Sequence, residues 1–157
     1  GLMALDMFQY ARNLIQKHQT HDVEEILDAL GICIHSFPMY GIRGLYKWLD
    51  GWPTVFVDSG LEYHERQFVL AHELAHFLFH RGQNRVFLDR RTYLKTDRYE
   101  KEADLFAACF LHPFPESYFH DGVTVQEISQ TLNLDNPAAK LYCQEFQKYV
   151  ALNNRKA

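Results

Sequence analysis

Two histidines four residues apart enclose a glutamate in this chain: His72, Glu73 and His76. On an α-helix, positions four apart lie one turn apart on the same face, so both imidazoles can reach one metal ion. Glu73 directly follows the first histidine, where a carboxylate can take a proton from a metal-activated water. The spacing therefore predicts a Zn²⁺ site that hydrolyses its substrate, with His72 and His76 as metal ligands and Glu73 as the general base.

A catalytic zinc ion takes three protein ligands and keeps a further position open. The third ligand is expected on a second helix, which begins at Asp97 and ends before Pro113. Glu100 and Asp104 share one face of that helix, so Glu100 could bind the metal while Asp104 orients a zinc-bound histidine. Glu100 could instead complete a capping box with Asp97. Glu102 is the alternative ligand, and otherwise it is expected to face solvent.

His80 continues the spacing of four, but it cannot be a further ligand. It lies about 12 Å along the helix from His72, so the two rings cannot share an ion. We expect His80 to be a helix C-terminal residue that is favoured by the helix dipole. A second group that stabilises the oxyanion is usual in such sites, and Tyr93, Tyr99 and His112 are candidates by their position in the sequence only.

The helix that carries the two histidines is expected to be buried. Ser59 and Glu62 form an S-x-x-E capping box, which predicts that the helix begins there. It should run to about His80 and end before Gly82. Apolar residues are spread over several of its sides, a pattern typical of a helix that is covered all round. The predicted metal site therefore lies in a dry, packed interior.

The other elements follow from hydrophobic spacing and turn residues. Helices are predicted over residues 2–19, 23–30, 97–112, 124–132 and 138–152, strands over 32–37 and on both sides of a turn at Asp50-Gly51, and a loop over 83–96. The strand Thr54–Asp58 could pair with an extended substrate or be an ordinary core strand. With 157 residues, of which 47% are apolar, the chain fits a single α+β domain over residues 1–157.

Composition excludes several classes of function. The net charge is −4 and no basic block is present, which argues against a nucleic-acid-binding protein. Residues 123–134 have the pattern of the first helix of a helix-turn-helix, but the helix that follows has few basic residues for phosphate contacts. The three cysteines are widely spaced and favour a reducing compartment. No run of about 18 apolar residues predicts a membrane span, so we expect a cytoplasmic protein.

Residues 65–80, residues 100–107 and a Leu111-His112-Pro113 end follow one another in an order that resembles the ImmA/IrrE metallopeptidases. The resemblance covers residues 5–150. It implies a small zincin-like domain with helices packed on a short, curved sheet, and a helix-turn-helix transcriptional repressor as the protein substrate. The E-x-x-A-D spacing is also similar to that of thermolysin-like and Ste24-like zinc peptidases, in which the first glutamate binds zinc. His112 departs from the family, which usually has an apolar residue there.

The leading functional hypothesis is an intracellular zinc-dependent endopeptidase. It would cut a helix-turn-helix repressor or an antitoxin and so relieve repression of phage, mobile-element or stress genes, without direct nucleic-acid or membrane contacts. The alternative is a regulatory binding module that keeps the zinc fold and grips a repressor or antitoxin without cutting it. Glu73 favours the enzyme, because a scaffold has no need of a general base.

Overall fold

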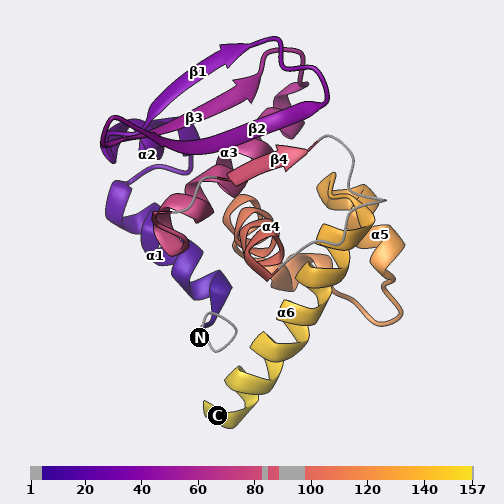
Figure 1. The fold of residues 1–157 in the computed structure, drawn as a ribbon. Coiled ribbons are helices and arrows are strands. Elements are labelled where there is room, and N and C mark those ends of the chain that lie inside the picture. Colours follow the sequence, from indigo (N-terminus) through magenta and orange to yellow (C-terminus); the bar gives the residue numbers. More distant parts are fainter. Residues whose placement is uncertain (1–4, 83–84, 89–97, 157) are drawn as a thin grey trace.

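A mixed four-stranded sheet forms one layer of the protein, and helices pack below it in the view of Figure 1. The computed structural model describes residues 5–82, 85–88 and 98–156. Its strands are β1 (Cys33–Phe37), β2 (Ile42–Leu49), β3 (Trp52–Asp58) and β4 (Arg85–Leu88), and its helices are α1 (Met7–His18), α2 (Val23–Ala29), α3 (Tyr63–Phe79), α4 (Arg98–Leu111), α5 (Val125–Leu132) and α6 (Asn136–Lys156). The predicted α+β class is confirmed. None of the helices in these described ranges is long and apolar enough to cross a membrane.

The central hairpin of the sheet is formed by β2 and β3. Asp50 and Gly51 both have positive φ angles, 48° and 83°. Two such residues form the tight turn whose twist suits antiparallel strands, so the predicted turn is confirmed. Tyr46, Val55 and Val57 point from the hairpin into the core and are fully buried.

Strand β3 is an internal strand, so Thr54–Asp58 is the core strand of the two alternatives, and pairing with a substrate is wrong. The strand order is β1-β3-β2-β4, with β1 parallel to β3 and the other neighbours antiparallel. Both edges of β3 are therefore already hydrogen-bonded, and Thr54–Asp58 cannot pair with an extended substrate. Among the described residues, the edge strands are β1 and β4.

The start of α3 differs from the prediction. The helix begins at Tyr63 with Glu62 as its N-cap residue, and no side-chain hydrogen bond caps it. Ser59 instead lies beyond the end of β3, where its N–H donates to the carbonyl of Phe37 at 3.1 Å. The predicted Ser59–Glu62 capping box is therefore wrong, because Ser59 belongs to the strand connection and not to the first turn of the helix.

The segment predicted as a loop over residues 83–96 contains β4, at Arg85–Leu88, which pairs with β2. The pairing has a register shift between Ile42 and Gly44. A strand of four residues is too short to show an alternating pattern, so sequence spacing does not reveal it. The remaining predictions for this region, including the helix start at Asp97, lie outside the described residues.

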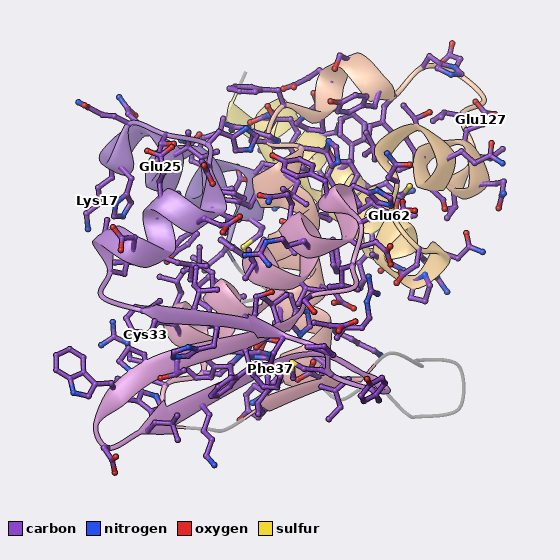
Figure 2. The ribbon with its side chains drawn as sticks, turned by 90° about the horizontal axis from the view of Figure 1, so that it is seen from above. Lys17, Glu25, Cys33, Phe37, Glu62 and Glu127 are labelled. Carbon is purple, nitrogen blue, oxygen red and sulfur yellow. The ribbon has the colours of Figure 1, made fainter. Side chains whose placement is uncertain are left out.

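Helices α3 and α4 form the centre of the helical layer. Every residue of α3 from Gln67 to Phe77 is buried, as predicted for the helix that carries the two histidines. Ala103 and Ala107 on α4 are fully buried, and α4 is one of the principal neighbours of α3. Figure 2 shows the helices on either side: Lys17 and Glu25 mark α1 and α2, and Glu127 marks α5 at the opposite side.

Two polar contacts tie the outer helices to this pair. The Arg66 guanidinium of α3 contacts the Glu24 carboxylate of α2 at 2.9 Å. The Tyr142 hydroxyl of α6 donates to the carbonyl of His112, just past the C-terminal end of α4, at 2.7 Å. The second contact places α6 against the end of the helix that carries Glu100 and Asp104.

Candidate metal centre

Three predicted ligands meet between α3 and α4. His72 Nε2 lies 2.9 Å from Glu100 Oε2, His76 Nε2 lies 3.2 Å from Glu100 Oε1, and the two Nε2 atoms are 3.2 Å apart. Both histidines are fully buried, while the Glu100 side chain is 18% exposed. The structure therefore brings together the three groups that the sequence proposed as a metal site.

The donor set fits a tetrahedral metal ion. Zinc binds histidine nitrogen and carboxylate oxygen at about 2.0–2.2 Å, which puts neighbouring ligands of a tetrahedral site about 3.3 Å apart. The separations between His72, His76 and Glu100 are close to this value. Glu100 is the partly exposed member of the three, so solvent reaches the site on its side.

Asp104 occupies the position predicted for the residue that orients a ligand. Its Oδ1 lies 2.7 Å from His72 Nδ1, on a side chain that is 7% exposed. Burial lowers the pKa of His72, but the hydrogen bonds to Asp104 and Glu100 outweigh it and raise that pKa to about 10. For Glu100, burial raises the pKa, and the hydrogen bonds to His72 and His76 reverse the shift and hold it well below the usual range.

The Nδ1 atom of His76 contacts another histidine, whereas that of His72 contacts a carboxylate. Its Nδ1 lies 2.9 Å from His80 Nδ1, and His80 Nε2 lies 2.9 Å from Glu102 Oε1. Glu102 is buried, so the expectation that it faces solvent is wrong, and its carboxylate contacts His80 rather than the three converging donors. His80 ends α3 as expected, but it is buried between His76 and Glu102.

Glu73 lies beside this centre with both carboxylate oxygens buried. Neither oxygen has a hydrogen-bond partner among the described residues. Burial raises the pKa of Glu73 to about 8; the charge of His72 opposes the shift and the negative charge of Glu100 adds to it. A buried carboxyl group without partners is costly, and it is expected where a bound water or substrate supplies the missing contacts.

The strand over Glu73 comes unusually close because it carries a glycine. A β-carbon on Gly44 of β2 would lie 2.6 Å from Val69 Cγ1 and 3.1 Å from Glu73 Oε1. Any side chain there would push the strand away from α3 or displace the carboxylate. Gly44 is a residue of the site that motif spacing misses, since nothing in the sequence shows which helix a strand glycine will contact.

The three candidates for a second polar group take different positions. Tyr99 contacts the ring of His80 edge-on at 4.7 Å between ring centroids. His112 Nε2 lies 3.1 Å from the carbonyl of Leu132, away from the three donors. Tyr93 lies outside the described residues. Motif spacing does not point to Tyr46, which is fully buried on the inner face of β2 with its ring 6.3 Å from that of His76.

A groove of about 380 Å³ runs beside the first half of α3. Phe68 lines it one helical turn before His72, and Arg43 lines it from β2 next to Gly44. Arg43 is buried and contacts the Glu65 carboxylate at 3.2 Å. The groove therefore gives the metal centre a neighbouring space with both apolar and charged walls.

The amino-acid sequence of this chain is similar to those of known proteins. Residues 27–142 match the family model described as the IrrE N-terminal-like domain, a peptidase family. An immunity region protein of Bacillus phage phi105, described as uncharacterized, is 33% identical over 103 residues, which are 65% of this chain and 65% of that protein. The metallopeptidase ImmA of Bacillus subtilis strain 168 is 28% identical over 97 residues, which are 62% of this chain and 57% of that protein.

The match covers less than two thirds of the length of each relative. The family model, however, covers well over half of this chain and includes both helices of the candidate centre. The family is one of metallopeptidases, which implies a divalent metal at the site. The chain belongs to the ImmA/IrrE family of metallopeptidases.

Proposed function

We propose that this protein is a zinc-dependent endopeptidase that cuts a helix-turn-helix repressor or antitoxin. The observation that carries the proposal is the convergence of His72, His76 and Glu100 beside the Glu73 carboxyl group, which has no hydrogen-bond partner in the described part of the chain. The immunity region and ImmA names of the two relatives favour a regulatory protein substrate. Cleavage of that substrate would relieve repression of phage, mobile-element or stress genes.

The proposed chemistry assigns a role to each group. A zinc ion held by His72, His76 and Glu100 would supply Lewis acidity that activates a water and polarises the scissile carbonyl. Glu73 takes a proton from the water as the water oxygen bonds to the carbonyl carbon. Glu73 then delivers that proton to the amine nitrogen as the C–N bond breaks. Burial raises the pKa of Glu73 to about 8, which makes the ionised carboxylate a stronger base than an exposed one.

An extended substrate segment could add to an edge strand of the sheet close to this chemistry. Strand β4 is an edge strand among the described residues and pairs with β2, the strand whose Gly44 covers Glu73. An extended segment added to β4 would gain main-chain hydrogen bonds. This assignment replaces β3, whose two edges are already paired.

A comparison of wild type with Glu73→Gln tests the proposed function. Each protein, loaded with zinc, is incubated with a lysate of the source organism, and new protein N-termini are identified by mass spectrometry. We expect the wild type to create a new N-terminus in a helix-turn-helix protein. The variant should lower the rate about 10²- to 10⁴-fold, the usual contribution of a general base.

Two results of that experiment would contradict the proposal. Equal cleavage by Glu73→Gln would remove the general-base role. Absence of new N-termini, while both proteins hold zinc and bind the same repressor, would favour the non-cleaving binding module. The buried carboxyl group of Glu73, which no described residue hydrogen-bonds, is the feature that favours the enzyme over that module.

A further inference from the structure

His76 is connected to a buried carboxylate through a second imidazole ring. Its Nδ1 lies 2.9 Å from His80 Nδ1, and His80 Nε2 lies 2.9 Å from Glu102 Oε1. The side chains of His80 and Glu102 are only 1% and 7% exposed, so water competes little for these contacts. Three side chains from two helices thus form one continuous chain of polar contacts.

The Glu102 carboxylate sets the direction of both hydrogen bonds in this series of contacts. Ionised Glu102 can only accept, so His80 must donate from Nε2. A neutral imidazole has one protonated nitrogen, which leaves His80 Nδ1 as an acceptor and requires His76 to donate from Nδ1. His76 Nε2 then keeps a lone pair, on the atom that faces His72 and Glu100.

The opposite polarity would remove the metal ligand. If His80 carried a proton on Nδ1 and donated it to His76 Nδ1, neutral His76 would hold its own proton on Nε2. That proton would point at the three converging donors and block coordination. Only the polarity imposed by an ionised Glu102 leaves both ring nitrogens of His76 in the states that metal binding needs.

We propose that Glu102 and His80 are positioning residues that fix the tautomer and orientation of His76 for metal binding. Asp104 does the same for His72 by direct contact at 2.7 Å. The three acids of α4 then have separate roles, with Glu100 as ligand, Asp104 behind one histidine and Glu102 behind the other. This role depends on the metal site of the proposed function but not on peptide cleavage.

Nitrogen NMR of the imidazole rings tests the donor and acceptor assigned in these two hydrogen bonds. The ¹⁵N shifts distinguish protonated from unprotonated ring nitrogens, and they are measured in metal-free and zinc-loaded wild type. We expect His80 protonated on Nε2 alone and His76 protonated on Nδ1 in both forms. A proton on His80 Nδ1 in either form would overturn the proposal. The metal-free spectrum decides this even if the wild type binds no zinc, a result that would overturn the proposed function instead.

Zinc affinity tests whether Glu102 and His80 support metal binding by His76. Affinity is measured by competition with a chelator for wild type, Glu102→Gln and His80→Phe, with no activity assay required. Residues that support a metal ligand usually change affinity about 10- to 100-fold, and we expect a loss of this size in both variants. A Gln side chain keeps the shape of Glu102 but can also present its amide donors to His80, which allows the wrong polarity.

Glu145→Gln is the matched control. Glu145 on α6 is also buried, at 4% exposed, and accepts a hydrogen bond from the Met7 N–H at 3.1 Å. Its neutralisation should leave zinc affinity unchanged. Wild-type affinity in Glu102→Gln, or an equal loss in Glu145→Gln, would overturn the proposal. If Glu102→Gln fails to fold, His80→Phe and the wild-type NMR measurement still decide it.

Discussion

Asp104 Oδ1 lies 2.7 Å from His72 Nδ1, while the other ring nitrogen of His72 lies 2.9 Å from Glu100 Oε2. One buried imidazole is thus held between two carboxylates of the same helix. Burial disfavours the charged ring, but these hydrogen bonds prevail and raise the pKa of His72 to about 10. Without metal, His72 therefore carries an extra proton at neutral pH, and a metal ion must displace it.

The first prediction is that zinc binding releases the proton of His72. Below the raised pKa, each binding event displaces this proton, so the apparent affinity should rise with pH, by up to about tenfold per pH unit, until the pH nears about 10. Calorimetry in buffers of different ionisation enthalpy counts the released protons. The comparison is with Asp104→Asn. In this variant the release of the His72 proton on zinc binding should end at a lower pH, and zinc affinity should fall about 10- to 100-fold.

An identical pH dependence of proton release in wild type and Asp104→Asn would contradict this account. It would mean that the contact between Asp104 and His72 does not control the protonation of the ring. The comparison depends only on the difference between the two proteins, so protons released from groups that the charge of Asp104 does not influence cancel.

The second prediction concerns Gly44. A β-carbon 2.6 Å from Val69 Cγ1 and 3.1 Å from Glu73 Oε1 is too close for either contact to remain unchanged. Gly44→Ala should lower the free energy of unfolding by about 1–3 kcal/mol, which is typical of overpacking, and reduce any peptidase activity by displacing Glu73. Urea unfolding and a cleavage assay measure the two effects.

Gly60→Ala is the control for that substitution. A β-carbon on Gly60 would be 3.5 Å from Asp58 Oδ2, an ordinary contact, and its φ does not require glycine. We expect stability close to that of the wild type. Equal stability and activity of Gly44→Ala and Gly60→Ala would show that β2 does not need its close approach to α3.

The third prediction concerns stability at alkaline pH. Burial raises the pKa of Tyr142 above its usual value near 10, and its hydroxyl donates to the His112 carbonyl. Between the unfolded and folded pKa values the unfolded chain loses this proton and the folded chain keeps it. The contribution of Tyr142 to the free energy of unfolding should be fully present below about pH 10. Above that pH it should decline by up to about 1.4 kcal/mol per pH unit.

Tyr142→Phe should reduce that alkaline loss, whereas Tyr40→Phe should leave it unchanged, because Tyr40 is 93% exposed. Unfolding free energies from urea titrations at a series of pH values above 9 measure the slopes. If the slope for Tyr142→Phe matches that of the wild type, the loss of stability at high pH comes from other groups.

Helical periodicity predicts which candidate site residues share one face of a helix. Residues four apart share a face, which pairs His72 with His76 and Glu100 with Asp104 from the amino-acid spacing alone. Periodicity does not reveal what packs against the other faces of a helix. The expectation of a solvent-facing Glu102 fails for that reason, because its face meets the end of α3 at His80.

Elements without a local pattern escape prediction from the sequence. Strand β4 has four residues and depends on pairing with β2, a contact distant in sequence. The role of Gly44 likewise depends on the packing of a strand against α3, which one sequence cannot show. The organisation of residues 1–157 as a single domain stays a prediction.

The central claim is that His72, His76 and Glu100 hold one catalytic zinc ion, and the zinc content of wild type, Glu73→Gln and Glu100→Ala tests it most directly. Each protein is equilibrated with zinc, dialysed and measured by elemental analysis. We expect about one zinc per chain in the wild type and in Glu73→Gln, and a sharp reduction in Glu100→Ala, because a three-ligand site loses one ligand. No zinc in the wild type, or equal zinc in Glu100→Ala and the wild type, would contradict the account.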